Sequence, residues 1–112
     1  MPDYHDKIFK LAGNTENGEV SGETLFHYRQ HGNIVTATYA GGGIVEGHLI
    51  AVADRDGVLD MRYHHVNRHG ALMTGVCRST PETLPNGKIR LREKWQWTSG
   101  DHSAGESMVE EC

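Results

Sequence analysis

KIRLREKWQW, residues Lys88–Trp97, alternates between two kinds of side chain. One face carries apolar and aromatic residues with Glu93 at its centre, and the other carries arginine, lysine and glutamine. A period of two predicts a β-strand with one buried face. Because burying an unpaired carboxylate costs free energy, Glu93 is expected to be paired, protonated or placed against a ligand. The stretch therefore predicts a strand with a reactive or binding group on its inner face.

Turn-forming residues recur along the whole chain. They are Asn17-Gly18, His31-Gly32-Asn33, Gly41-Gly42-Gly43, Asp56-Gly57, His69-Gly70, Asn86-Gly87 and Ser99-Gly100-Asp101. Asn-Gly and Asp-Gly supply the positive φ angles that tight hairpins require. Between the turns we predict eight strands, at about residues 7–14, 24–30, 34–39, 44–53, 58–66, 71–79, 88–98 and 103–110. The stretch Thr80–Gly87, with two prolines, is predicted to be a long rim loop.

No segment has a helical stripe, and hairpin-linked strands of this number favour an all-β, antiparallel up-and-down β-barrel, because closure removes exposed edges. We expect one such domain over residues 1–112. Val45, Gly47, Leu49 and Ala51 are expected to share one face of their strand. The face of the second strand stays open, since Phe26 and Tyr28 alternate with Leu25 and His27.

Composition excludes several classes of function. The chain has 112 residues, 37% of them hydrophobic and 23% charged, with a formal net charge of −4. This balance is typical of a globular protein and gives no basic face for nucleic acid. No apolar run is long enough to span a membrane, and the first residues lack the apolar stretch of a signal peptide. Cys77 and Cys112 suggest free thiols, so we expect a cytoplasmic location.

From Asn14 onward the chain resembles a family of small, largely uncharacterised bacterial proteins, some of which carry the label N-acetylglutamate synthase. The matching stretches are ENGEVSGETLFHYRQHGNIV, YAGGGIVEGHLI, DGVLDMRYHHVN, LMTGVCRSTPE and IRLREKWQWTSGDHSAGESMVEE. An acetyltransferase of the usual kind holds the acetyl-CoA pyrophosphate on a Gly-rich turn that opens a helix. Here Gly41–Gly43 is followed by another strand pattern. We therefore predict that the label is a misannotation.

The architecture also resembles small barrels of the calycin type, the lipocalins and fatty-acid-binding proteins. The resemblance implies an interior that holds one small ligand. On the expected inner faces, the candidate ligand-binding residues are Tyr28, Tyr39, Tyr63, His65, Glu93, Trp95 and Trp97. Aromatic walls with a few fixed polar groups are typical of a small-molecule site.

Three alternatives remain open for this cluster. Glu93 and His65 could act as an acid–base pair in a small enzyme, if they lie within hydrogen-bond reach of each other or of one substrate. Glu93 could instead belong to a buried network with Arg29, Arg78 or Tyr63, which would rigidify a core without function. A fully packed barrel would act as a structural or interaction protein, and an unpaired strand would allow a homodimer.

Metal and cofactor chemistry has weak support. The eight histidines include no HExxH motif, and paired Cys-x-x-Cys motifs are absent. His64 and His65 are adjacent in a strand and point to opposite faces, although His27, His48 and His65 could meet from separate strands. We expect no metal and no cofactor. The basic face formed by Arg90, Arg92 and Lys94 is expected to be a solvated sheet surface paired with Glu106 and Glu110.

Overall fold

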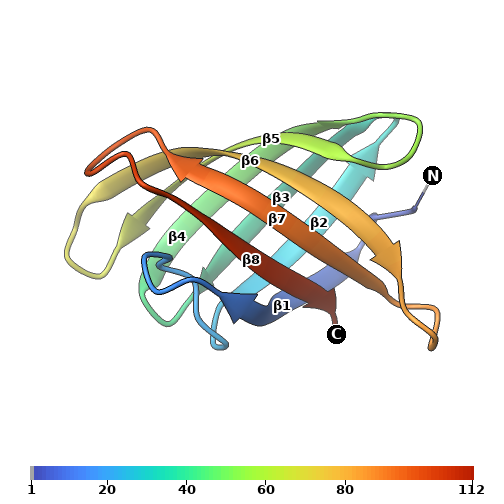
Figure 1. The fold of residues 1–112 in the computed structure, drawn as a ribbon, viewed down its shortest axis with the longest axis horizontal. Helices are drawn as coiled ribbons and strands as arrows, with labels where there is room; N and C mark the ends of the chain where they lie inside the picture. Colours follow the sequence, from blue (N-terminus) through green and yellow to red (C-terminus); the bar gives the residue numbers. More distant parts are fainter. Residues whose placement is uncertain (1) are drawn as a thin grey trace.

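The computed structural model describes residues 2–112. Eight antiparallel strands follow one another around a closed barrel, in which β8 pairs with β1 (Figure 1). The strands are β1 (Lys7–Asn14), β2 (Leu25–His31), β3 (Ile34–Gly41), β4 (Ile44–Ala53), β5 (Leu59–Asn67), β6 (Leu72–Thr83), β7 (Ile89–Trp97) and β8 (Ala104–Glu111). The predicted all-β, up-and-down barrel is confirmed. Within the described residues, no helix is long and apolar enough to cross a membrane.

The Gly41–Gly43 turn is a hairpin between β3 and β4. Gly41 and Gly42 have φ angles of 118° and 60°, values that side chains rarely adopt. The turn therefore continues a sheet, as predicted, and does not open a helix.

The predicted rim loop at Thr80–Gly87 is wrong in extent. β6 continues to Thr83, and Pro81 pairs with Leu91 of β7. On its other side β6 loses its partner after Ser79, which pairs with Leu59 at the start of β5. Beyond that point β6 is an edge strand toward β5, where a proline without an N–H group is tolerated.

A β-bulge in β4 makes one predicted strand face wrong. The register between β4 and β5 shifts between Ile44 and Glu46. As a result Ile44 is buried, whereas Val45, which was expected to point inward with Leu49, is 61% exposed. An extra residue reverses the alternation on one side of the bulge. In β2, where the face was open, Phe26 and Tyr28 are the buried residues.

One half of the barrel is packed solid. Its fully buried side chains include Phe9, Tyr28, Val35, Leu59 and Leu91. The N-terminal segment closes this end, because Tyr4 is fully buried and its hydroxyl donates to the Gly57 carbonyl oxygen at 2.6 Å. The connections β1–β2, β3–β4, β5–β6 and β7–β8 lie at the opposite end, on the left in Figure 1.

Candidate ligand site in the barrel interior

A cavity lies in the half of the barrel that is not packed solid. Its volume is about 60 Å³, which is the space of about two water molecules in the liquid. Its apolar wall includes Leu11, Val20, Phe26, Leu49, Met61, Cys77 and Val109; its aromatic wall is Tyr39, Tyr63, Trp95 and Trp97; its polar groups are Asn14, Glu19, His65, Glu93 and Ser107. The cavity thus combines apolar walls with a few polar groups, as small-molecule sites do.

The cavity brings together six of the seven residues suggested by the sequence. Tyr39, Tyr63, His65, Glu93, Trp95 and Trp97 all line it. Tyr28 does not, because it lies in the packed half with its ring 4.8 Å from that of Phe9 and 6.1 Å from that of Tyr4.

Three of the aromatic side chains lie over glycines of the neighbouring strand. Tyr39 pairs with Gly47 and Tyr63 pairs with Gly75. A Cβ atom added at either glycine would overlap the tyrosine ring. Trp95 covers Gly105 in the same way. The rings therefore lie against the wall instead of filling the centre, and this leaves the interior partly open.

Glu93 lies in a polar row that crosses four strands. Ser79 of β6 pairs with Glu93 of β7, Glu93 with Ser107 of β8, and Ser107 with Asn14 of β1. Ser79 Oγ donates to Glu93 Oε2 at 2.7 Å, and Ser107 Oγ donates to Glu93 Oε1 at 3.0 Å. Burial raises the pKa of Glu93, and the two serine hydroxyls offset part of that rise.

These contacts replace the network considered from sequence. Arg29 is exposed and lies 3.3 Å from Asp6 on the outer surface, and Arg78 is exposed as well. Among the described residues Glu93 forms no ion pair within 4 Å. The neighbouring serines come from β6 and β8, so only the register of the closed barrel reveals them.

His65 links two other groups of the cavity. Its Nε2 lies 2.7 Å from Glu19 Oε1, and its Nδ1 lies 2.9 Å from the Tyr39 hydroxyl. Burial raises the pKa of Tyr39, so its hydroxyl keeps its proton, and this hydroxyl also lies 3.4 Å from the His64 carbonyl oxygen as a donor. In the neutral tautomer of His65 that carries its proton on Nε2, Nε2–H donates to Glu19 and Nδ1 accepts from Tyr39. His65 and Glu93 do not bond to each other, because the hydrogen bonds of His65 go to Glu19 and Tyr39. Both line the cavity, so an acid–base role on one bound substrate stays a prediction.

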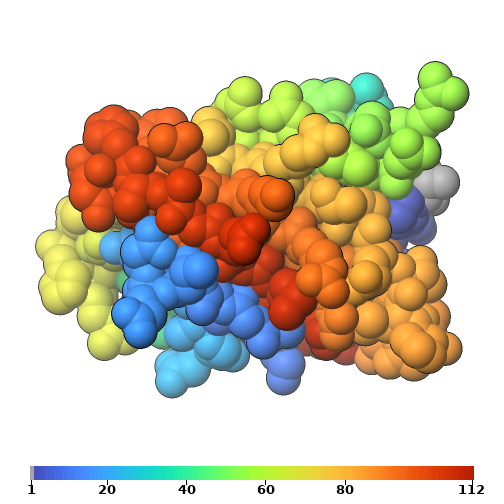
Figure 2. Space-filling model, in the orientation of Figure 1, coloured from blue at the N-terminus to red at the C-terminus, as the bar shows by residue number. Residues whose placement is uncertain are grey.

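Glu19 belongs to the segment 15–24, which closes the cavity. Asn67 Nδ2 donates to Glu19 Oε2 at 3.0 Å, and Trp97 Nε1 donates to the Asn17 carbonyl oxygen at 3.2 Å. Asn17 also donates to Ser103 Oγ at 3.0 Å. Figure 2 shows the blue atoms of this segment packed beside the orange-red β7–β8 hairpin. Glu19 was not predicted from the sequence, because a loop carboxylate has no periodic neighbours. The one signal that could have indicated a loop turned inward is the apolar Val20 beside it.

The histidines considered for a metal do not meet. His27 and His48 have exposed or half-exposed side chains on the outer surface, where His48 lies 3.0 Å from Glu46, whereas His65 points inward. No group of three or more His, Cys, Asp or Glu side chains could hold a metal ion within residues 2–112. On the outer sheet surface Arg90 pairs with Glu110 at 2.7 Å, as expected for a solvated face.

A closed antiparallel meander of eight strands with a cavity in one half is a barrel of the calycin type. Its sequence matches the family model described as avidin-like protein over residues 2–112. The chain therefore belongs to the avidin-like family. No curated protein and no solved structure matches it. The expected likeness to calycin-type barrels is confirmed, whereas a bacterial origin and the misannotation of the synthase label stay predictions.

Proposed function

We propose that this barrel binds a small, partly apolar molecule in its interior cavity. The observation that carries the proposal is the composition of the cavity wall, in which aromatic and aliphatic side chains surround Glu93 and His65. Closed barrels of eight strands hold one small ligand in streptavidin and in lipocalins. Membership of the avidin-like family supports the same function.

The size of the cavity limits the ligand. A cavity of about 60 Å³ is less than half the size of the roughly 150 Å³ cavity that holds benzene, so it accepts a molecule of about two or three non-hydrogen atoms without rearrangement. Biotin, which streptavidin binds, is larger than this space. Its entry would require the segment 15–24 to move away from His65 and Trp97, so biotin belongs in any ligand screen as the probe for an opened cavity.

Tryptophan fluorescence is a direct test. The chain has two tryptophans, Trp95 and Trp97, and both line the cavity. We expect a ligand from a metabolite screen to change the emission saturably. Glu93→Gln and Trp95→Ala should weaken the response, whereas Gln96→Ala, on the exposed face of the same strand, should not. If all three variants respond like the parent, the ligand does not bind in the interior.

Two further expectations accompany this proposal. We propose that the protein self-associates through the outer face of β3 and β4, where Ile34, Ile50 and Val52 are exposed. We also propose a cytoplasmic location, which cell fractionation would test.

A further inference from the structure

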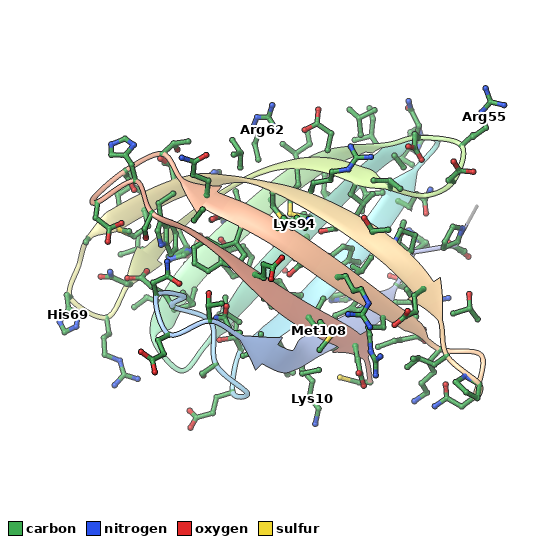
Figure 3. All side chains as sticks on the ribbon, in the orientation of Figure 1. Lys10, Arg55, Arg62, His69, Lys94 and Met108 are labelled. Atoms are coloured by element: carbon green, nitrogen blue, oxygen red, sulfur yellow. The ribbon has the colours of Figure 1, made fainter. Side chains whose placement is uncertain are left out.

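The cavity has an unbalanced charge. Two carboxylates, Glu19 and Glu93, line it, and no lysine or arginine does. Figure 3 shows the labelled Lys10, Arg55 and Arg62 projecting away from the barrel. The interior therefore presents negative charge and acceptor atoms to whatever enters it.

Glu93 has hydrogen bonds but no counter-charge. Its two oxygens accept from the hydroxyls of Ser79 and Ser107. Each hydroxyl has one proton and carries no net charge, so these bonds leave the charge of an ionised Glu93 uncompensated. Glu19 differs, since it already pairs with His65 and Asn67. Glu93 is partly buried, and a carboxylate that is largely removed from water and has no cation beside it gains from a positively charged ligand.

The same polar row contains a second acceptor without a donor. Asn14 Nδ2 donates to the Val20 carbonyl oxygen at 3.2 Å, which fixes the orientation of the amide. Asn14 Oδ1 then has no hydrogen-bond partner. Within residues 2–112, no other buried side-chain nitrogen or oxygen atom lacks one. Glu93 thus lacks a counter-charge and Asn14 Oδ1 lacks a donor, and an ammonium group supplies both a positive charge and N–H donors.

The aromatic rings favour the same kind of ligand. Trp97 stands at 69° to Tyr63 and at 79° to His65, with ring centroids 5.7 Å apart in both pairs. Trp95 adjoins it at 5.5 Å. The faces of indole and phenol rings attract cations, most strongly where water is excluded. Rings at steep angles to one another offer such faces on more than one side.

We propose that the cavity selects a small organic ammonium ion, with its nitrogen at Glu93 and its carbon atoms against Trp95 and Trp97. This inference rests on the proposed function and adds the chemical class of the ligand. The volume limits the ion to about two or three non-hydrogen atoms unless the segment 15–24 opens. An inorganic cation fits less well, because the rings and aliphatic side chains of the wall offer it no ligand atoms.

Three probes of equal chain length test the charge preference. They are ethylammonium, ethanol and acetate, titrated against the tryptophan fluorescence of the unmodified protein at constant ionic strength in sodium chloride. We expect ethylammonium to bind at least tenfold more tightly than ethanol, and acetate to bind most weakly. If ethanol binds as tightly as ethylammonium, the ammonium inference fails and the interior site stands. If neither these probes nor the metabolite screen changes the emission, both proposals fail.

A charge-removing variant locates the preference. Glu93→Gln keeps the shape of the side chain, so we expect it to bind ethanol like the parent and to lose most of the preference for ethylammonium. Glu106→Gln removes an exposed carboxylate from the adjacent strand and should keep the preference. A Glu93→Gln protein that still prefers the ammonium ion by tenfold would overturn the assignment to Glu93. If this variant does not fold, the three-probe comparison on the unmodified protein still decides the charge preference.

Discussion

At the scale of single residues, Glu93 is where the requirements of folding and of binding conflict. Burial among aromatic rings favours its neutral form, and the two serine hydroxyls favour the carboxylate. The net result is a raised pKa. A bound cation would favour the carboxylate further, so ligand binding and the ionisation of Glu93 are coupled.

The first prediction concerns the pH dependence of stability. Because the folded-state pKa of Glu93 is raised above 4.5, its contribution is fully present below the unfolded pKa and is lost as the pH rises through the folded pKa. The parent should therefore lose stability relative to Glu93→Gln over that window, by at most about 1.4 kcal/mol per pH unit. Urea unfolding at a series of pH values measures this. Parallel curves for the two proteins would contradict it, and Glu106→Gln should run parallel to the parent.

The second prediction concerns the glycines beneath the aromatic rings. Gly75→Ala places a methyl group where the ring of Tyr63 lies. We expect a loss of about 1–3 kcal/mol in the free energy of unfolding, because overpacking forces the ring off its rotamer. Gly22→Ala is the matched control, since nothing lies within 4 Å of its added methyl group. Thermal or urea unfolding of both variants measures the difference, and equal stability would show that Tyr63 moves at no cost.

At the scale of elements, period-two alternation and turn residues predicted every strand, with ends within a few residues of those observed except at β6. Local patterns identify strands because each alternation reports a burial preference along a single segment. They could not locate the bulge at Val45 or the extension of β6 past Pro81. Both depend on how the neighbouring strand pairs at that position along the barrel axis.

The residues of the candidate site could also be predicted only in part from the sequence. Trp95, Trp97 and Glu93 share the face of one strand, so their proximity follows from the sequence alone. Ser79 and Ser107 became visible as partners only through the register of β6 and β8 with β7. Tyr28 points into the barrel as expected, but it lies toward the packed end and not at the cavity. Alternation along a strand does not indicate where along the barrel axis a residue lies.

The third prediction concerns the segment 15–24 as the cover of the cavity. Glu19→Gln replaces the charge-assisted hydrogen bonds to His65 and Asn67 with weaker neutral ones. A loss of about 1–1.5 kcal/mol corresponds to roughly tenfold faster opening. Hydrogen exchange of the backbone amides of residues 15–24 measures it. Glu16→Gln, an exposed change in the same segment, should leave the exchange unaltered, and equal rates in both variants would show that Glu19 does not hold the segment.

At the scale of the whole molecule, the barrel divides stability and binding between its two ends. The packed half, closed by Tyr4, contains the fully buried side chains of Phe9, Tyr28, Leu59 and Leu91. The other half carries the cavity, the polar row and the closing segment. Residues at the cavity end can therefore change binding at moderate cost, because the opposite end retains most of the core.

The last prediction concerns the outer surface. Ile34 of β3 pairs with Val52 of β4, and Ile50 lies two residues along the same strand. All three are about half exposed and share one outer face, so a second copy could cover them. We expect a concentration-dependent dimer in sedimentation experiments and a monomer for Val52→Lys, since a charge at the centre of such a contact is costly to bury. Val45→Lys, equally exposed near the far end of β4, is the control and should stay dimeric. A parent that is monomeric at every concentration, or equal dissociation of both variants, would rule out this face as the contact.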